Sequence, residues 1–299
     1  MIRVLKRIKN YFIDLGFFGF ISDEKFLKYK YKSFFRRELN LKDPIFFTEK
    51  LQWLKLNYRD EKMSMLVDKY AVKHYINEKV RDRDLHTIPT FGVFDKFSDI
   101  PFDKLPKRFV IKCTHDSGSV TVVRDKNKLN YWKERLYFSF KQRCNFYNRY
   151  REWPYKNVKP RILVEQFMED DKTDALTDYK FFCFDGEPKF MYISKDDSHD
   201  PRTDFFDMDY NHLDLRLRDP NADILPKCPK EFGKMKKLAS KLSKGFPFVR
   251  VDFYVINSKI YFGEFTFYHL GGFFYFHPEE WDRVIGDMLK LKKFGDGNE

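Results

Sequence analysis

Two runs near the end of the chain decide the fold: Phe248-Val249-Arg250-Val251-Asp252-Phe253-Tyr254 and Ile260-Tyr261-Phe262-Gly263-Glu264-Phe265-Thr266-Phe267. Their aromatic and β-branched residues are typical of strands, and Asn257-Ser258 between them predicts a turn. We therefore expect an antiparallel pair. Because alternate residues of a strand share a face, Arg250 and Asp252 lie on one side, and the turn returns Glu264 close to Asp252.

This cluster of one arginine and two carboxylates has two interpretations. Buried carboxylates are costly unless a cation or a phosphate lies next to them, and Mg²⁺ takes one or two carboxylates together with phosphate oxygens. The cluster therefore predicts a magnesium and phosphate site. A salt-bridge cluster of Arg250, Asp252 and Glu264 on a solvent-facing surface is the alternative.

A second candidate site lies earlier in the chain. Lys112 is near the end of an expected strand, Phe109 to Cys113, whose hairpin partner is Val120 to Val123. Ser117-Gly118-Ser119 between the strands lets backbone N–H groups approach an anion, and the lysine adds a point charge. An ordinary hairpin turn is the alternative. The sequence contains no Walker A motif.

The remaining pattern sets the fold class. Helical periodicity dominates up to about residue 80, and short strands mixed with helices follow, including a hairpin signal at Asp185-Gly186. Because strands and helices do not alternate strictly, the pattern predicts an α+β protein.

Composition narrows the classes of function. The 299 residues include 57 Lys and Arg and 45 Asp and Glu, a formal net charge of +12. No apolar run approaches the ~20 residues of a membrane span, and none of the 4 cysteines forms a C-x-x-C pair. We expect a soluble, cytoplasmic protein and, without a nucleic-acid-binding motif beside the charge, no nucleic-acid partner.

Positive charge is concentrated at the N-terminus, where residues 1–60 hold 14 Lys and Arg against 7 Asp and Glu, a difference of +7. Apolar residues recur at helical spacing from Met1 to Leu15, with Arg3, Lys6, Arg7 and Lys9 among them. This pattern predicts a helix that either contacts an anionic membrane surface or packs on its own domain with a solvated basic face.

Taken in order, the motifs resemble the ATP-grasp superfamily and, in places, D-alanine–D-alanine ligase. They are a helix start at Val67-Asp68-Lys69, Lys112 with its Ser-Gly loop, Val164-Glu165-Gln166-Phe167-Met168, Arg250-x-Asp252 and Glu264-x-Thr266. The run Asp178-Tyr179-Lys180-Phe181-Phe182-Cys183-Phe184-Asp185-Gly186-Glu187-Pro188 is similar to the D-Y-K-F-F-x-F-x-G-x-P run of the TupA-like branch, named for teichuronopeptide synthesis. The resemblance covers about residues 60 to 290.

The resemblance implies an ATP-grasp fold, in which the nucleotide is held between two mixed α+β sub-domains, with a helical N-terminal extension. It implies four consecutive segments: a basic helical region over 1–60, a helical portion over 61–105, a first sub-domain with the phosphate loop over 106–168, and a second sub-domain with the magnesium-binding strands over 169–299.

Site roles follow from the same resemblance, for ATP and Mg²⁺ as cofactors. The residues implied to bind ATP are Lys69, Lys112, Ser117, Gly118, Ser119 and Lys180 around the phosphates or ribose, and Glu165, Gln166, Phe167 and Met168 at the adenine. Those implied to hold Mg²⁺ are Asp252, Glu264 and Thr266. Arg250 and Lys112 are the implied catalytic residues, and His269, Gly271 and Gly272 line the acceptor side.

Three positions depart from the family pattern. Glu264-Phe265-Thr266 stands where ATP-grasp ligases usually have Glu-x-Asn, which leaves open whether one or two Mg²⁺ bind. Cys113 follows Lys112 where proline is common, and the 114–119 loop has a single glycine.

The implied reaction is a carboxylate–amine ligation that forms an amide bond through an acyl phosphate. By resemblance, the carboxylate belongs to a uronic-acid glycan of the cell surface or its lipid-linked precursor, and the amine is an amino acid or amino alcohol. The basic N-terminal helix, where it contacts a membrane, would fit an enzyme that works on lipid-linked glycans at the inner membrane face. Three alternatives remain: a glycan kinase on the same fold, a glycosyltransferase using Asp207-Met208-Asp209, and a non-enzymatic binding module.

Overall fold

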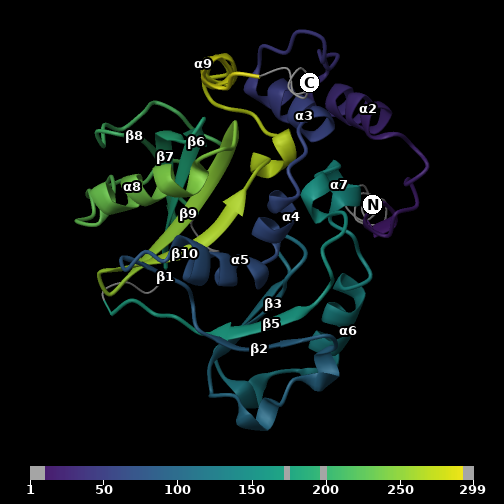
Figure 1. Cartoon of the computed structure of the whole chain (residues 1–299), viewed down its shortest axis with the longest axis vertical. Helices are drawn as coiled ribbons and strands as arrows, with labels where there is room; N and C mark the ends of the chain where they lie inside the picture. Colours follow the sequence, from purple (N-terminus) through teal and green to yellow (C-terminus); the bar gives the residue numbers. More distant parts are fainter. Residues whose placement is uncertain (1–10, 172–175, 196–200, 292–299) are drawn as a thin grey trace. The chain divides into compact units, whose positions relative to one another are not determined.

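The computed structural model describes residues 11–171, 176–195 and 201–291. These residues form two compact units (Figure 1). Unit 1 takes its described residues from 1–26, 60–79 and 88–168, and unit 2 takes them from 27–59, 80–87 and 169–299. Each unit therefore combines stretches that are distant in the sequence, and its boundaries differ from those of the four predicted consecutive segments. The division into four segments stays a prediction.

Unit 1 is built on a four-stranded antiparallel sheet in the order β2-β5-β3-β4. Its strands are β2 (Thr90–Phe94), β3 (Phe109–Cys113), β4 (Val120–Val123) and β5 (Ile162–Gln166). Burial alternates along β3, so Phe109, Ile111 and Cys113 face the core and Lys112 lies on the opposite face. The expected β3–β4 hairpin is present.

The core of unit 1 lies between this sheet and helix α6 (Tyr131–Lys141), with Phe138 of α6 buried beside Phe97, Ile111 and Val164 (Figure 1). The other helical elements are α4 (Lys62–Val67), α5 (Ala71–His74), η1 (Tyr75–Val80), η2 (Phe97–Asp99), η3 (Phe102–Lys104), η4 (Lys126–Lys128), α7 (Tyr147–Tyr150) and η5 (Trp153–Tyr155). Residues 11–14 are helical, whereas residues 1–10 of the predicted N-terminal helix lie outside the described residues.

Unit 2 is built on a six-stranded sheet in the order β1-β10-β9-β6-β7-β8, antiparallel except for the β1–β10 pair. Its strands are β1 (Leu85–His86), β6 (Thr177–Phe184), β7 (Glu187–Lys195), β8 (Thr203–Asp207), β9 (Phe248–Ile256) and β10 (Lys259–Thr266). Helix α8 (Phe232–Ser243) packs on β6, β7 and β9 through Met235, Leu238 and Leu242 (Figure 1).

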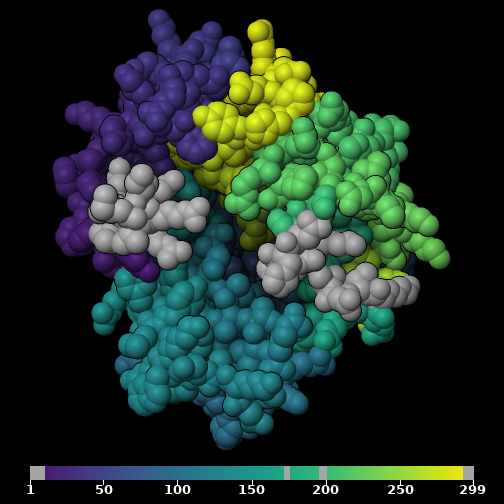
Figure 2. Space-filling model, turned by 180° about the vertical axis from the view of Figure 1, so that it is seen from behind, coloured from purple at the N-terminus to yellow at the C-terminus, as the bar shows by residue number. Residues whose placement is uncertain are grey.

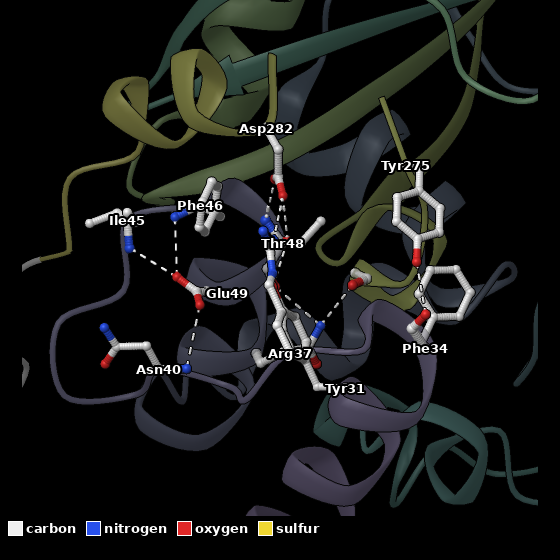
Figure 3. Close-up of polar contacts among 12 residues, drawn as sticks. Tyr31, Phe34, Arg37, Asn40, Ile45, Phe46, Thr48, Glu49, Tyr275 and Asp282 are labelled. Carbon is white, nitrogen blue, oxygen red and sulfur yellow. Dashed lines mark hydrogen bonds and ion pairs between the residues drawn. The ribbon is translucent and has the colours of Figure 1, made fainter. Parts of the chain in front are cut away.

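A buried polar network ties α2 (Asp23–Phe35), α3 (Phe47–Asn57) and α9 (Trp281–Met288) together (Figure 3). Asp282 accepts from the backbone N and the hydroxyl of Thr48, at 2.9 and 2.7 Å. Arg37 donates to Asp282 at 3.2 Å and to the Tyr31 hydroxyl at 3.0 Å. Glu49 accepts from the backbone N–H of Phe46, which closes the first turn of α3. Helix α3 is thereby fixed at its N-terminal end.

One antiparallel sheet and one mixed sheet, with strands and helices that do not alternate strictly, confirm the α+β fold class. Across the part of the chain that the structure describes, no helix is both long and apolar enough to cross a membrane.

Candidate active site

Arg250 on β9 is the centre of the candidate site in unit 2. Its Nε and Nη2 donate to the two carboxylate oxygens of Asp252, both at 2.7 Å, and Nη2 also donates to Glu264 at 2.9 Å. Its Nη1 donates to Nδ1 of His269 at 2.7 Å. Each guanidinium nitrogen therefore has a partner, and the 6% exposed side chain has a fixed orientation.

Lys180 on β6 supplies a second cation to the same carboxylate. The β6–β9 register places Lys180 opposite Asp252, and its Nζ lies 2.9 Å from Asp252 and 3.1 Å from Asp178. Burial would raise the pKa of Asp252, but Arg250 and Lys180 outweigh burial and lower it. Burial raises the pKa of Asp178 despite Lys180. Asp252 is thus the ionised anion that joins the two cations.

A β-bulge in β10 brings Glu264 to the face of Arg250 and Asp252. Phe265 pairs with Val251 and Phe262 with Phe253, so two residues, Gly263 and Glu264, stand opposite Asp252. A side chain at position 263 would place its Cβ 3.0 Å from the Asp252 carbonyl oxygen, so only glycine fits without a shift. The bulge therefore turns Glu264 toward the arginine.

The predicted metal ligands lie around this one guanidinium. Thr266 pairs with Arg250 across the strands, and its hydroxyl donates to Glu264 at 3.1 Å. Within the described ranges, no three His, Cys, Asp or Glu side chains form a metal cluster by themselves. The oxygens of Asp252, Glu264 and Thr266 nevertheless fit Mg²⁺, which commonly takes one or two carboxylates and completes its shell with water and phosphate oxygens.

His269 is fully buried and contacts Arg250. Because arginine only donates hydrogen bonds, Nδ1 of His269 must be the acceptor and the ring proton is on Nε2. Burial, followed by the nearby charges of Arg250 and Lys180, holds the pKa of His269 well below its usual range. Its predicted place on the acceptor side stays a prediction, since its observed neighbours are Arg250 and the rings of Phe182 and Phe274.

Gly271 and Gly272 form a left-handed loop after β10, within η6 (His269–Gly272). Leu270, Gly271 and Gly272 have φ of 47°, 65° and 69°. The loop's carbonyls accept from two buried side chains of α3: Lys55 donates to Gly271 at 2.7 Å, and Gln52 donates to Gly272 at 3.0 Å. Sequence analysis did not identify Gln52 or Lys55; their three-residue spacing on one helix face is the available signal.

In unit 1, Glu165 is held between two lysines. Its side chain is 4% exposed, and it forms ion pairs with Lys73 on α5 and, at 2.8 Å, with Lys112 on β3. Burial would raise the pKa of Glu165, but Lys112 and Lys73 outweigh burial and lower it. Lys112 and Glu165, both predicted site residues, thus meet on one face of the sheet. Lys73 was missed, although it lies four residues after Lys69 at helical spacing.

The 114–119 loop is closed by its own polar contacts. Lys69 donates to the backbone oxygen of Asp116, and Asp116 also accepts from the Ser119 hydroxyl. Ser117 and Gly118 are exposed at the tip, and Gly118 has φ of 90° with open space around it. The tip is therefore accessible, whereas Lys69 and Ser119 hold its base.

The predicted adenine-reading segment continues from β5. Gln166 is exposed and donates through its backbone N to Pro89 at 2.9 Å. The guanidinium carbons of Arg108 and Arg124 lie 5.1 and 5.4 Å from the centroid of the Phe167 ring, and Met168 is half-buried. Each of these cation–π contacts favours this position of the ring.

Asp207-Met208-Asp209 forms a turn after β8. Asp207 accepts from the backbone N–H groups of Asp209 and Asn211, at 2.9 and 2.8 Å, and from the Asn211 side chain at 2.8 Å. The carboxylate of Asp207 therefore closes the turn, which gives the glycosyltransferase interpretation no support.

Solved structures similar to this chain include a D-alanine–D-alanine ligase from Bacillus anthracis complexed with ATP, 17% identical over 68% of this chain and 55% of that chain, with a TM-score of 0.39. The corresponding ligase from Helicobacter pylori is 15% identical over 73% and 61%, with a TM-score of 0.40. A RimK-domain ATP-grasp protein from Sphaerobacter thermophilus is 12% identical over 76% and 69%, with a TM-score of 0.40. The chain thus spans less than two thirds of either ligase.

The family of the chain is shown by its sequence rather than by these distant structures. No curated protein matches the sequence. The TupA-like ATP-grasp family matches residues 49–290, a range that contains the Glu165 ion pairs, the Arg250 cluster and helix α3 from Glu49 onward. The chain therefore belongs to the TupA-like ATP-grasp family.

Proposed function

We propose that the protein is an ATP- and Mg²⁺-dependent carboxylate–amine ligase. The observation that carries the proposal is the Asp252 carboxylate, which joins Arg250 and Lys180 next to the 44% exposed Glu264. The group has three carboxylates, counting Asp178, against two cations, so a divalent cation complements its charge and would in turn attract phosphate oxygens. The family match over the same residues supports this choice.

The proposed reaction has two displacements. A carboxylate oxygen of the acceptor bonds to the γ-phosphorus of ATP, and ADP leaves. The amine nitrogen then bonds to the carbonyl carbon, phosphate leaves, and the amine loses a proton. Bound Mg²⁺ would neutralise charge on the transferred phosphoryl group, which is worth several kcal/mol.

The chain's own residues act mainly by positioning and charge. Asp252, Glu264 and Thr266 would hold Mg²⁺, and Lys180 would keep Asp252 ionised and oriented. Arg250 has its donors fixed in advance, so it stabilises developing charge without reorganising. In unit 1, Lys112 and Lys69 would bind phosphate, and Glu165 orients Lys112. Ser117 and Gly118 at the exposed tip would supply backbone N–H groups.

For the substrates, we propose a uronic-acid glycan or its lipid-linked precursor as the acceptor and an amino acid or amino alcohol as the amine. This substrate class is supported by the family to which the chain belongs.

We further propose that the N-terminal region contacts anionic membranes at their inner face. Tyr11, Phe12, Leu15, Phe17 and Phe20 are exposed within ten residues. The segment is anchored to unit 1 because buried Asp14 pairs with Arg149, whose Nε lies 2.9 Å away. Exposed aromatic residues that follow the cations of residues 1–10 suit an anionic lipid surface.

The test of the ligase proposal is calorimetric titration of ATP into the purified protein, with and without Mg²⁺. We expect micromolar, Mg²⁺-dependent binding that Asp252→Asn weakens and Asp209→Asn, a matched change of an exposed carboxylate, leaves unchanged. A protein that ignores ATP and binds a UDP-sugar would instead be a glycosyltransferase, and binding of neither would leave a binding module. Release of ADP without phosphate during turnover would identify the kinase alternative.

A further inference from the structure

The buried contact between His269 and Arg250 is one of the contacts that hold the arginine in place. The imidazole packs edge-on against Phe182 and Phe274, with ring centroids 5.0 Å apart in each case. Its Nδ1 accepts from Arg250 at 2.7 Å. Its Nε2 has no hydrogen-bond partner among the residues that the structure describes, and the side chain is fully buried. Within the described ranges, Arg250 is therefore the one hydrogen-bond partner of this ring.

A buried donor without a partner is costly, so the ring is retained here at a cost to stability. A phenylalanine at this position would keep an aromatic ring against Phe182 and Phe274 but would remove the acceptor for Nη1 of Arg250. The property that distinguishes histidine from an apolar ring at this position is therefore the hydrogen bond that it accepts from Arg250.

The loop that carries His269 is itself braced. Gly271 and Gly272 adopt left-handed backbone conformations that expose their carbonyls to α3, where Lys55 and Gln52, both fully buried, donate to them. A Cβ at position 272 would lie 2.2 Å from Nε2 of Gln52, so the contact requires glycine. Helix α3 is in turn fixed by the Thr48–Asp282 contacts (Figure 3).

We propose that His269 is a positioning residue that fixes Arg250 through Nδ1 of a neutral imidazole, and that Gln52 and Lys55 position His269 by holding the loop. This inference rests on the proposed function, since it assigns Arg250 to the transferred phosphoryl group. It predicts that loss of the acceptor at position 269 weakens binding of the transition state more than binding of the nucleotide.

The first measurement is the tautomer of His269, read from long-range ¹H–¹⁵N correlations of the imidazole in the full chain, with His269→Asn identifying the signal. We expect a neutral ring protonated on Nε2, whether or not ATP binds. A proton on Nδ1, or an imidazolium at pH 7, would overturn the proposal. Because this readout needs no nucleotide, it is independent of the ligase assignment.

The second measurement compares His269→Asn with His269→Phe. The asparagine oxygen can replace Nδ1 as the acceptor, whereas phenylalanine keeps the ring and removes the acceptor. The probes are ADP–Mg²⁺ alone and ADP–Mg²⁺ with aluminium fluoride, a mimic of the transferring phosphoryl group. The extra affinity for the mimic is the factor by which ADP–Mg²⁺ binds more tightly with aluminium fluoride than without it. We expect His269→Phe to lower this factor about tenfold or more, with ADP affinity nearly unchanged, and His269→Asn to keep most of it.

Thermal unfolding of both variants separates positioning from folding. If the two variants lose affinity for the mimic equally, His269 acts only through its packing, and the proposal is overturned. Lys55→Met, a close match in shape, should act in the same direction as His269→Phe but more weakly. If the wild-type protein shows no extra affinity for the mimic, the ligase assignment fails, and the tautomer alone then decides the Arg250–His269 contact.

Discussion

Lys180 and Asp252 face each other across β6 and β9, and the ammonium lies 2.9 Å from a carboxylate that also accepts two hydrogen bonds from Arg250. Asp252 is 1% exposed, so it is a buried anion shared by the buried Arg250 and the half-buried Lys180. Its removal would leave Arg250 with Glu264 and Lys180 with Asp178 as their carboxylate partners. Binding and stability therefore depend on the same side chain.

Asp252→Asn should destabilise the protein by about 3–5 kcal/mol, the usual cost of breaking a buried ion pair on one side. Urea unfolding measures this change. Asp209→Asn, at an exposed turn position, should stay within about 0.5 kcal/mol of the wild type. Similar values for the two variants would show that the Asp252 cluster is not buried in solution.

Glu264→Gln should lower ATP consumption by about two to three orders of magnitude while leaving the fold intact, because it removes one charge at the phosphoryl group. Its side chain is 44% exposed, so little stability depends on it. Phosphate release from ATP and a thermal unfolding curve are the two measurements. Glu187→Gln, on an exposed carboxylate of β7, is the matched control. Near-normal turnover of folded Glu264→Gln would refute the magnesium assignment.

Gly263→Ala should destabilise the protein by about 1–3 kcal/mol and weaken Mg²⁺-dependent ATP binding, because the added Cβ meets the Asp252 backbone at 3.0 Å. Gly233→Ala on α8 has nothing within 4 Å and should stabilise the helix by up to about 1 kcal/mol. Chemical unfolding and ATP calorimetry on both variants test this. If both variants behave alike, the bulge does not constrain position 263.

The stability of the protein should depend on pH through Glu165. Because its pKa is lowered in the folded state by Lys112 and Lys73, its contribution is present above the unfolded value of about 4.3 and is lost as pH falls through the folded pKa. The difference in melting temperature between wild type and Glu165→Gln should therefore shrink below about pH 4.3. A difference that stays constant or grows on acidification would contradict the ion pairs.

Deletion of residues 1–20 should abolish sedimentation with vesicles that contain anionic lipid. A Phe17→Ser and Phe20→Ser double variant, which keeps every cation, should reduce binding through lost apolar burial. Vesicles of neutral lipid are the control for charge. Unchanged vesicle binding by the deletion variant would remove the membrane proposal.

The strands and local motifs could be predicted from the sequence because their signals are short-range. The alternation around Arg250 and Asp252 and the turn at Asn257-Ser258 are enough to predict the β9–β10 pair. The bulge was not predicted, although the spacing of three between Phe262 and Phe265, around a glycine, is a local signal for it.

Contacts between distant segments could not be predicted. Helix α3 and the 269–272 loop meet although about 215 residues of chain separate them, as the contact from Lys55 to Gly271 shows. The three-residue spacing of Gln52 and Lys55 places them on one helix face but does not show that this face is buried. The lowered pKa of His269 likewise depends on its burial and on the nearby charges of Arg250 and Lys180, which only the tertiary fold provides.

The bulge at Gly263 shifts the alternation of core-facing and outward-facing residues along β10 by one position. From Ile260 to Phe262, even-numbered positions face the core, whereas after the bulge Phe265 does so and the even-numbered Glu264 and Thr266 face the arginine. Deleting Gly263 would remove the bulge and leave Glu264 alone opposite Asp252, with Phe262 and Phe265 still on one face. Inserting or deleting one residue elsewhere in β10 would instead exchange the two faces beyond that point, so such changes in length should be tolerated far less well.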